Sequence, residues 1–429
     1  MDKEEAIKLV WIVWYRMART KLLVMVIAAV IVALMVAGCT TTSQQNGTKT
    51  NNTTSGVTEV DLLYSGGVGP MPNLLAMNQI DGYIAWQPFV QIGLDANIAK
   101  LVSLSQNFPP NASWNDHPCC VVTARDDLIA AHPDFVNTMS ALTILGDQYI
   151  TDHQDESADI MADWLAGRGN LTYGNVSVAS GSAVSGAIKN VKYTTTPSDS
   201  WKNGTRQFVT AQKSLGLLSG KLNNATPDQV DNLLFNFGPY QNATTMISQN
   251  KFVTPAKIDG QIGVGYLKGD MHSAGLLVAI KKWQYMSDTY GIALKPQDPT
   301  QSKPDVCDLI VNGQKVAEVK LVSADAGPQL MQLEGTSSVQ MGYAGVPPAI
   351  AAIDTGMPIK VLMPINNEGS GLVAAASSPA GDWNSFIGWA QQRSTAGNPL
   401  KIAVPSKGSI QDVMLRFALK DSGVVVKEV

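Results

Sequence analysis

The stretch IGVGYLKGDMHSAG, residues 262–275, guides the interpretation of the whole chain. Its apolar start, residues 262–266, predicts a strand, and a glycine turn with Asp270, His272 and Ser273 separates that strand from an apolar helix pattern. A strand, a polar loop and a helix in this order form the repeating unit of α/β proteins, whose ligands bind at the loop. Such a unit is expected near the start of a domain, yet here it follows more than half of a 429-residue chain.

The composition is typical of a globular protein without a large net charge. Of the residues, 45% are hydrophobic and 15% are charged, which is enough to bury one large or two medium-sized cores. The formal net charge is −4, and no basic stripe or aromatic platform accompanies it. We therefore expect no nucleic-acid partner.

The cysteines do not form a disulfide pattern. Apart from Cys39 near the N-terminus they are Cys119, Cys120 and Cys307, an odd number with one adjacent pair. The adjacent pair is compatible with small buried strand residues. No CxxC motif or histidine cluster is present, so we expect no metal and no cofactor.

The N-terminus reads as an export signal. A basic region (Arg19, Lys21) precedes apolar residues 22–37, and Val-Ala-Gly-Cys at 36–39 resembles the lipobox of prokaryotic lipoproteins. We expect residues 1–38 to be a signal peptide, with Met17 as an alternative start, Cys39 to carry lipid, and residues 39–56 to form a polar tether. An uncleaved membrane anchor is the alternative, because the apolar run nearly spans a bilayer. Both place the rest of the chain outside the cytoplasm.

Strand and helix patterns alternate from residue 57 onward. We expect strands over 57–63, 80–85, 119–124, 262–266, 308–311, 316–322, 339–343, 359–363, 371–376, 401–404 and 424–429. We expect helices over 71–78, 133–152, 156–165, 198–218, 226–235, 274–286, 329–334 and 411–420, with a polar connection over 242–256. This alternation predicts an α/β protein with mostly parallel sheets.

Several polar loops follow predicted strands, where backbone N–H groups and helix N-termini face a ligand. Their candidate binding residues are Trp86 and Gln87; Lys268, Asp270, His272 and Ser273; Gly345; Asn367, Glu368 and Ser370; and Ser406, Lys407 and Ser409. Each loop alone also has a structural explanation. The Gly-Ser turn before residue 410 fits a helix cap, Trp86 fits a core position, and His272 fits a helix start.

Sequence patterns of common enzymes are missing. The chain has neither a G-x-S-x-G nor an H-E-x-x-H motif. Asp270 and His272 would make an acid–base pair, but no nucleophile is evident beside them. We expect a protein that is not an enzyme.

Five segments together resemble one family, the extracytoplasmic substrate-binding proteins of ABC importers for nitrate, sulfonates, taurine and bicarbonate, within a superfamily that includes thiamine-pyrimidine-synthesis proteins. The segments are GYLKGDMHSAGLLVAIKK (265–282), VQMGYAGVPPAIAAIDTGMPIKVLMPINNEGSGLV (339–373), LKIAVPSKGSIQDVMLRFALKDSGV (400–424), MPNLLAMNQIDGYIAWQPF (71–89) and NDHPCCVVTARDDLIAAHPDFV (115–136). The resemblance spans most of 57–240 and 258–429.

The order of these segments departs from the family. The part that comes last in the family comes first here, and Ser-Gly-Val at 422–424 repeats Ser-Gly-Val at 55–57. We interpret this as a circular permutation, with residues 243–257 as the new link; a truncated tandem array or a mis-assembled gene is the alternative. Permutation predicts that the strands at 57–63 and 424–429 share a lobe.

The resemblance implies a type II periplasmic-binding-protein-like fold, with two α/β lobes closing over a ligand. Lobe 1 would hold residues 119–257 and 258–378, and lobe 2 would hold residues 57–118 and 380–429. The matching motifs add Val346 and Gln411 to the candidates, with His117 and Cys119 beside Trp86 and Gln87. His117 is alternatively a turn residue before Pro118.

The resemblance also implies a function. The expected protein is a monomeric, membrane-tethered receptor that delivers a small anionic or zwitterionic solute to an ABC permease and ATPase. Gln87 stands where family members often carry Glu, which favours an anion, whereas Asp270 and Glu368 favour a ligand with an amine or a pyrimidine. The alternatives are an enzyme of the same fold acting on a pyrimidine- or menaquinone-pathway intermediate, and a degenerate module without transport function.

Overall fold

The computed structural model describes residues 57–110 and 113–429. The expected signal peptide, Cys39 and the polar tether lie outside the described residues. Among the helices in the described ranges, none combines the length and apolar character needed to cross a membrane.

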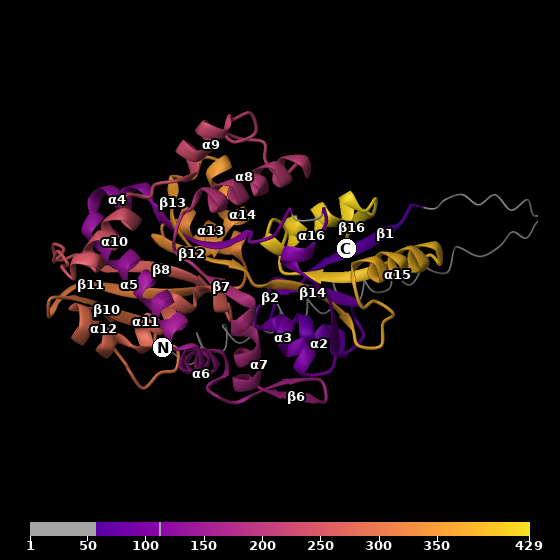
Figure 1. Ribbon diagram of the computed structural model, residues 1–429, viewed down its shortest axis with the longest axis horizontal. Coiled ribbons are helices and arrows are strands. Elements are labelled where there is room, and N and C mark those ends of the chain that lie inside the picture. The colour runs from indigo at the N-terminus through magenta and orange to yellow at the C-terminus, as the bar shows by residue number, and fades with distance from the viewer. Residues whose placement is uncertain (1–56, 111–112) are drawn as a thin grey trace, which may run out of the picture. The chain divides into compact units, whose positions relative to one another are not determined.

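A six-stranded sheet with its helices forms lobe 2, drawn on the right of Figure 1. Its strand order is β16-β1-β15-β2-β14-β3. The strands are β1 (Glu59–Tyr64), β2 (Gly82–Trp86), β3 (Ala99–Leu104), β14 (Ser370–Ala375), β15 (Leu400–Val404) and β16 (Val425–Glu428). Around them pack α2 (Met71–Ala76), α3 (Phe89–Asp95), α15 (Trp383–Thr395) and α16 (Ile410–Asp421). Strand β14 thus lies in this sheet although its residues fall in the range expected for lobe 1.

An eight-stranded sheet forms lobe 1, with the order β7-β13-β4-β12-β8-β11-β10-β9. Its strands are β4 (Pro118–Arg125), β7 (Val191–Tyr193), β8 (Gln261–Leu267), β9 (Ile292–Pro296), β10 (Val306–Val311), β11 (Gln314–Ala324), β12 (Met341–Gly345) and β13 (Ile359–Glu368). One face is covered by α5 (Pro133–Asp152), α10 (Gly238–Gln249), α11 (Ala274–Lys281) and α12 (Trp283–Tyr290), and the other by α8 (Asp199–Ser214), α9 (Pro227–Leu234), α13 (Gly327–Gly335) and α14 (Val346–Asp354) (Figure 1). Helices α4 (Asp126–Ala131) and α6 (Gln154–Ala166) complete this lobe.

The two-lobed α/β fold is confirmed, but the sheets are mixed rather than mostly parallel. In the eight-stranded sheet only the pairs β12–β8 and β8–β11 are parallel among the seven neighbouring pairs. Strand β4 enters from the other lobe and runs against both β12 and β13, and short connections make β9, β10 and β11 antiparallel. The expectation of parallel strands holds for the β16-β1-β15-β2 part of lobe 2.

Local sequence signals predicted most of the other helices and strands. The expected hairpin turns at Asn312 (φ 49°) and Gly313 (φ 77°), the two positive φ values that a type I′ turn requires. The expected helix over 274–286 is interrupted at Lys282, which separates α11 from α12. The expected polar connection over 242–256 is wrong in its first half, because α10 continues to Gln249 and buries Ala243 against α5. The outer face of this helix is polar, so the apolar periodicity of the sequence did not indicate a helix there.

The chain crosses between the two sheets at adjacent places. The first crossover is the segment 105–117 between β3 and β4, and the second is Gly369 between β13 and β14. The backbone N–H of Glu368 donates to the carbonyl of His117 at 3.1 Å, so the two crossovers contact each other directly. Two such connections side by side are the usual hinge of a two-lobed binding protein.

A further segment of lobe 1 reaches across to lobe 2. It contains β5 (Asn170–Tyr173), β6 (Val176–Ala179) and α7 (Ser180–Ala187), and we call it the strap. Tyr173, Val178 and Ala183 are buried in the same apolar cluster as α2 and α3 of lobe 2. The strap was not predicted, because its short elements carry little periodicity.

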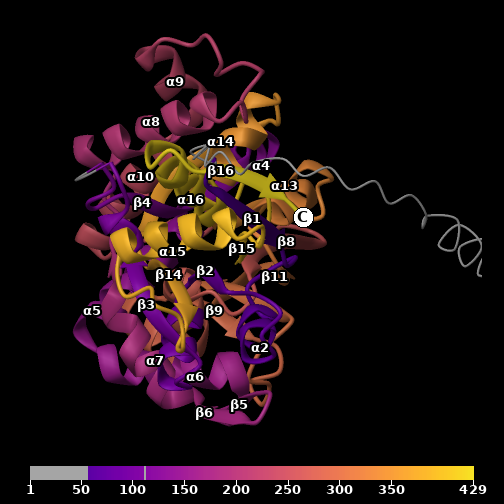
Figure 2. The ribbon, with the colours of Figure 1, turned by 90° about the vertical axis from the view of Figure 1, so that its right-hand side faces the viewer.

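Strands from opposite ends of the described chain lie side by side in lobe 2. Strand β16 pairs with β1 in parallel, with Val60 opposite Val426, and Figure 2 shows the two strands together. The N–H of Val425 donates to the carbonyl of Thr58 at 2.8 Å. The shared lobe that a permutation predicts for these strands is therefore present.

Candidate functional site

Loops at the ends of strands from both lobes converge on one small buried cavity. Lobe 1 contributes the loops after β8 and β12 and the start of β4, and lobe 2 contributes the end of β2 and the start of α16. Its lining residues are Trp86, Cys120, Leu267, Asp270, His272, Gly327, Gly345, Pro348, Ser409, Ile410 and Gln411. The volume is about 10 Å³, enough for about one water molecule. The lobes are therefore closed on each other here.

Asp270 and His272 form a buried ion pair in this cavity. The Nδ1 atom of His272 lies 2.8 Å from Oδ1 of Asp270, and the same oxygen accepts the backbone N–H of His272 at 2.9 Å. Burial opposes protonation of the imidazole, but the Asp270 carboxylate outweighs it and raises the pKa of His272 to about 10. The loop after β8 thus presents a cationic imidazole held by a carboxylate.

Two thiols lie against the imidazole. The Sγ of Cys119 is 3.7 Å from Nδ1 and 3.8 Å from Nε2 of His272, and the two cysteine Sγ atoms are 3.9 Å apart. Adjacent strand residues normally point to opposite faces. Here Cys119 has no partner on β13, while Cys120 pairs with Asn366 and Pro118 with Asn367, so a bulge aims both thiols to one side.

The two thiols are not activated nucleophiles. Burial raises the pKa of Cys119, and it raises that of Cys120 well above the ordinary value. A nucleophilic cysteine needs a lowered pKa, so the row of Asp270, His272 and Cys119 does not favour covalent catalysis.

Lobe 2 contributes hydrogen-bond donors to the cavity. The indole Nε1 of Trp86 is buried without a hydrogen-bond partner among the described residues. Gln411 donates to the Ser370 hydroxyl at 2.9 Å. Ser409 caps α16 by accepting the N–H of Asp412 at 3.2 Å.

Two helix N-termini meet at the cavity. Helix α16 begins after Ser409, and α14 begins at Val346 after Gly345, which has no capping side chain. The N-terminus of each helix carries partial positive charge and open N–H groups. Gly345 pairs with Cys120 across the β12–β4 ladder, which places the start of α14 beside the thiols.

Other expected site residues lie at the crossovers. Gln87 donates its backbone N–H to the carbonyl of Gly369 at 2.9 Å. His117 contacts the Pro118 carbonyl through Nδ1 at 2.9 Å and the Ser105 hydroxyl through Nε2 at 2.8 Å. Burial lowers the pKa of His117 to about 4, so this imidazole is neutral and braces the first crossover.

Asn367 and Glu368 brace the second crossover against the first. Asn367 donates to the carbonyl of Asp116 at 3.1 Å, and the Glu368 carboxylate accepts the backbone N–H of Asp116 at 2.9 Å. Lys192 lies 2.8 Å from the same carboxylate. Neither Asn367 nor Glu368 lines the cavity.

The two expected lysines are at the surface. Lys268 lies 3.9 Å from Asp325, and Lys407 lies 2.8 Å from Glu428 on the last strand. Ser406 is partly buried, and Ser273 is buried at the start of α11. The structure therefore brings Asp270, His272, Cys119 and the Trp86–Gln411 side together and leaves the lysines out.

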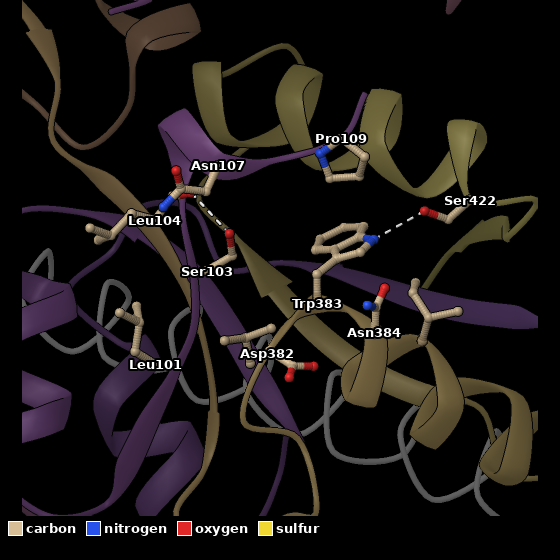
Figure 3. A pocket seen from close by; sticks show the side chains of 11 residues that line it. Leu101, Ser103, Leu104, Asn107, Pro109, Asp382, Trp383, Asn384 and Ser422 are labelled. Carbon is tan, nitrogen blue, oxygen red and sulfur yellow. Dashed lines mark hydrogen bonds between the residues drawn. The ribbon is translucent and has the colours of Figure 1, made fainter. Parts of the chain in front are cut away.

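A larger cavity lies elsewhere in lobe 2. It measures about 710 Å³ between β3, the first crossover and α15, and it contains none of the expected site residues. Figure 3 shows Trp383 in its wall, with the indole N–H donating to Ser422 at 3.1 Å. No ionic pair or unpartnered buried donor in the described part of the chain lines it. The small inter-lobe cavity has the polar chemistry, and we take it as the candidate site.

Two α/β lobes joined by paired crossovers, with loops of both lobes meeting at a buried polar cavity, define the periplasmic-binding-protein-like class. Within this class the chain belongs to the NMT1-like family, whose model matches residues 57–166 and 302–429, more than half of its length. Members of this family are typically binding proteins rather than enzymes, and the family supports a solute-binding role in general.

The matched residues include the cysteine pair, Trp86 and the start of α16, but not the Asp270–His272 loop. An uncharacterised protein of Methanocaldococcus jannaschii is 35% identical over 106 residues, which are 24% of this chain and 70% of that protein. No solved structure matches the chain significantly.

Proposed function

We propose that the protein is the extracytoplasmic, lipid-anchored solute-binding component of an ABC importer, and that it closes two lobes over a small anionic or zwitterionic solute. The observation that carries the proposal is the unpartnered indole N–H of Trp86 beside the His272 imidazole in the inter-lobe cavity. A buried donor without an acceptor is costly, and a solute oxygen placed between the lobes would satisfy it.

The charges around the cavity favour an anion. His272 is a cation, and the N-termini of α14 and α16 add partial positive charge. Asp270 offsets the charge of the imidazole, so the site suits a solute with one negative charge or a zwitterion rather than a dianion. Nitrate, alkanesulfonates, bicarbonate and the zwitterion taurine fit this description.

Binding requires the lobes to open. A cavity of about 10 Å³ does not hold even a nitrate ion, so the closed lobes must separate about the crossovers for the solute to enter. The strap must detach from α2 and α3, or move with them, during this opening.

A thermal-shift screen with nitrate, taurine, alkanesulfonates, bicarbonate and pyrimidines tests the proposal. A solute that binds only the folded state raises the melting temperature, with about 2.7 kcal/mol of stabilisation at a hundredfold excess over Kd. We expect one of these solutes to stabilise the wild type and to lose most of that effect in Trp86→Phe. Trp389→Phe on α15 is the matched control, because Trp389 lies outside the cavity. Equal shifts in both variants would contradict the role of Trp86.

The small cavity favours one second candidate, a module of this fold that has lost solute binding. Absence of any shift across the screen supports it over the importer component. The membrane anchor and the permease are tested separately, by fractionating cells after Cys39→Ala and by pull-down of the permease encoded nearest to the gene.

The circular permutation is also a proposal, and the neighbouring strands β1 and β16 support it. Because Val425 hydrogen-bonds Thr58, the chain leaving α16 arrives beside the start of β1. An ancestral chain that continued from residue 424 into residue 58 would need no long connection.

A further inference from the structure

A cluster of three metal-binding side chains lies in the candidate site. The Sγ atoms of Cys119 and Cys120 and a ring nitrogen of His272 all lie within 4.8 Å of one another, and all three residues are buried. Solute binding as proposed above uses the imidazole but gives no role to the thiols. The bulge that turns both thiols toward His272 therefore needs its own explanation.

The separations match those between ligands of one metal ion. Metal–sulfur bonds of about 2.3 Å and metal–nitrogen bonds of about 2.0–2.1 Å at tetrahedral angles place ligand atoms roughly 3.5–3.8 Å apart. The observed separations are 3.7 and 3.8 Å between Cys119 and the imidazole and 3.9 Å between the thiols. The separations fit a coordination sphere, but Cys119 Sγ is nearly equidistant from the two ring nitrogens, so the imidazole must turn for Nε2 to point at the ion.

Asp270 orients the imidazole as a carboxylate orients a metal-binding histidine. It contacts Nδ1 of His272 at 2.8 Å, which leaves Nε2 as the free ring nitrogen. Gly369 keeps side chains away from that nitrogen, since a Cβ on Gly369 would lie 2.2 Å from Nε2. Any other residue type at this place in the second crossover would therefore cover Nε2 with its side chain.

We propose that Cys119, Cys120 and His272 bind one thiophilic metal ion, Cu(I) or Zn(II), in the inter-lobe cleft. Two thiolates and an imidazole select these ions over calcium, magnesium or manganese, which prefer oxygen ligands. On binding, each thiol and the Nε2 atom of the His272 imidazolium release a proton to solvent, while Nδ1 keeps its proton toward Asp270. The start of α14 beside Cys120 favours the negative charge of the thiolates.

A tetrahedral ion held by three protein ligands keeps a fourth coordination position open. Trp86 and Gln411 line the same cavity as Cys120 and His272, and the anion of the proposed function is the ligand expected at that position. This last point alone rests on the proposed solute-binding function; the three protein ligands do not depend on it.

Metal titration of the full-length chain, purified anaerobically under reducing conditions and stripped with a chelator, tests the site. Zn(II) is titrated against a chromogenic chelator and Cu(I) against a colorimetric Cu(I) chelator. Co(II) serves as a spectroscopic probe through its sulfur-to-cobalt charge-transfer absorption. We expect one equivalent of Zn(II) or Cu(I) per chain, with the Co(II) band present.

Single variants Cys119→Ser, Cys120→Ser and His272→Gln should each weaken binding at least about 100-fold, and Asp270→Asn about 10- to 100-fold. The matched control is Cys307→Ser, because Cys307 is equally buried on β10 but outside the cluster. Circular dichroism identifies variants that do not fold, and these are set aside. The metal affinities of the folded variants then test the assignment of the ligands.

Two results would overturn the metal site. One is a wild type that binds no ion stoichiometrically; the other is a Cys119→Ser,Cys120→Ser double variant that folds and binds as tightly as Cys307→Ser. A solute shift in the thermal screen without metal binding would remove this proposal and keep the solute-binding function. Metal binding without any solute-induced shift in melting temperature would keep the metal site and remove the solute-binding function.

Discussion

The backbone N–H of Asp116 donates to the carboxylate of Glu368 at 2.9 Å, and this contact joins the two crossovers between the lobes. The Glu368 side chain is only 4% exposed and also contacts Lys192 at 2.8 Å. One carboxylate therefore satisfies a backbone donor of the first crossover and a lysine that follows the strap. Glu368 was a candidate ligand contact from the sequence, whereas its partners Asp116 and Lys192 were not.

Replacing Glu368 with Ala should destabilise the protein by about 1–3 kcal/mol, because the N–H of Asp116 loses its buried acceptor. Denaturant unfolding measures this change. Glu59→Gln is the control, since Glu59 makes a more accessible pair with Lys427 and should cost less than about 1 kcal/mol. Equal effects of the two substitutions would show that the Glu368 contact does not hold the crossovers.

Gly369→Ala should destabilise the protein by at least about 1–3 kcal/mol. Gly369 has φ 85°, and its added Cβ would lie 2.2 Å from His272 Nε2, so both backbone and imidazole must shift. Gly388→Ala in α15 provides the comparison, because nothing lies within 4 Å of its added Cβ. That substitution should stabilise by about 0.5–1 kcal/mol, and thermal unfolding of both variants distinguishes the two effects.

Glu334 should make stability depend on pH. Burial raises its pKa from 4.5 to about 8, opposed by the hydroxyl of Thr123, which donates to it at 2.9 Å. The folded state therefore holds a proton that the unfolded state releases above pH 4.5. This contribution to stability is complete below pH 4.5 and declines as pH rises to about 8.

Urea unfolding at several pH values measures this dependence. Glu334→Gln should flatten the decline in the free energy of unfolding between those two pH values, because an amide does not ionise. Glu318→Gln is the control: its hydrogen bond with Lys315 lowers the pKa of Glu318, so it titrates below this window. An unchanged pH profile in Glu334→Gln would show that Glu334 ionises normally in the folded protein.

A relinked chain tests the permutation. Residues 251–424 followed directly by residues 58–250 restore the family-like order and remove β16, which is mostly exposed. We expect this chain to fold, with a melting temperature within roughly 5 °C of the natural order. Opening the chain instead after Val264, inside the buried strand β8, should prevent folding. An insoluble relinked chain would count against the ancestral order.

Part of the fold was predictable from local patterns. Strand β8 and its polar loop, the Asn312-Gly313 hairpin and helix α5 follow from periodicity and turn chemistry that lie within the segments themselves. The strap and α10 were missed because their polar or short segments are held by contacts with distant elements. Strand direction in lobe 1 was missed because it depends on where β4 enters the sheet.

The sequence named much of the candidate site but not which candidates stay outside it: the cavity is lined by the candidates Trp86, Asp270, His272, Gly345, Ser409 and Gln411. The sequence by itself determined that this chain is an α/β protein whose polar loops follow its strands, because strand, turn and helix signals are local. The tertiary structure decided that His272 meets Cys119 and Cys120, residues 153 and 152 positions away, and that Lys268 and Lys407 stay at the surface. The bulge in β4 brings the two thiols to one side, and the two crossovers bring the lobes together. The bulge and the crossovers arise from strand pairings between distant parts of the chain, which no local pattern encodes.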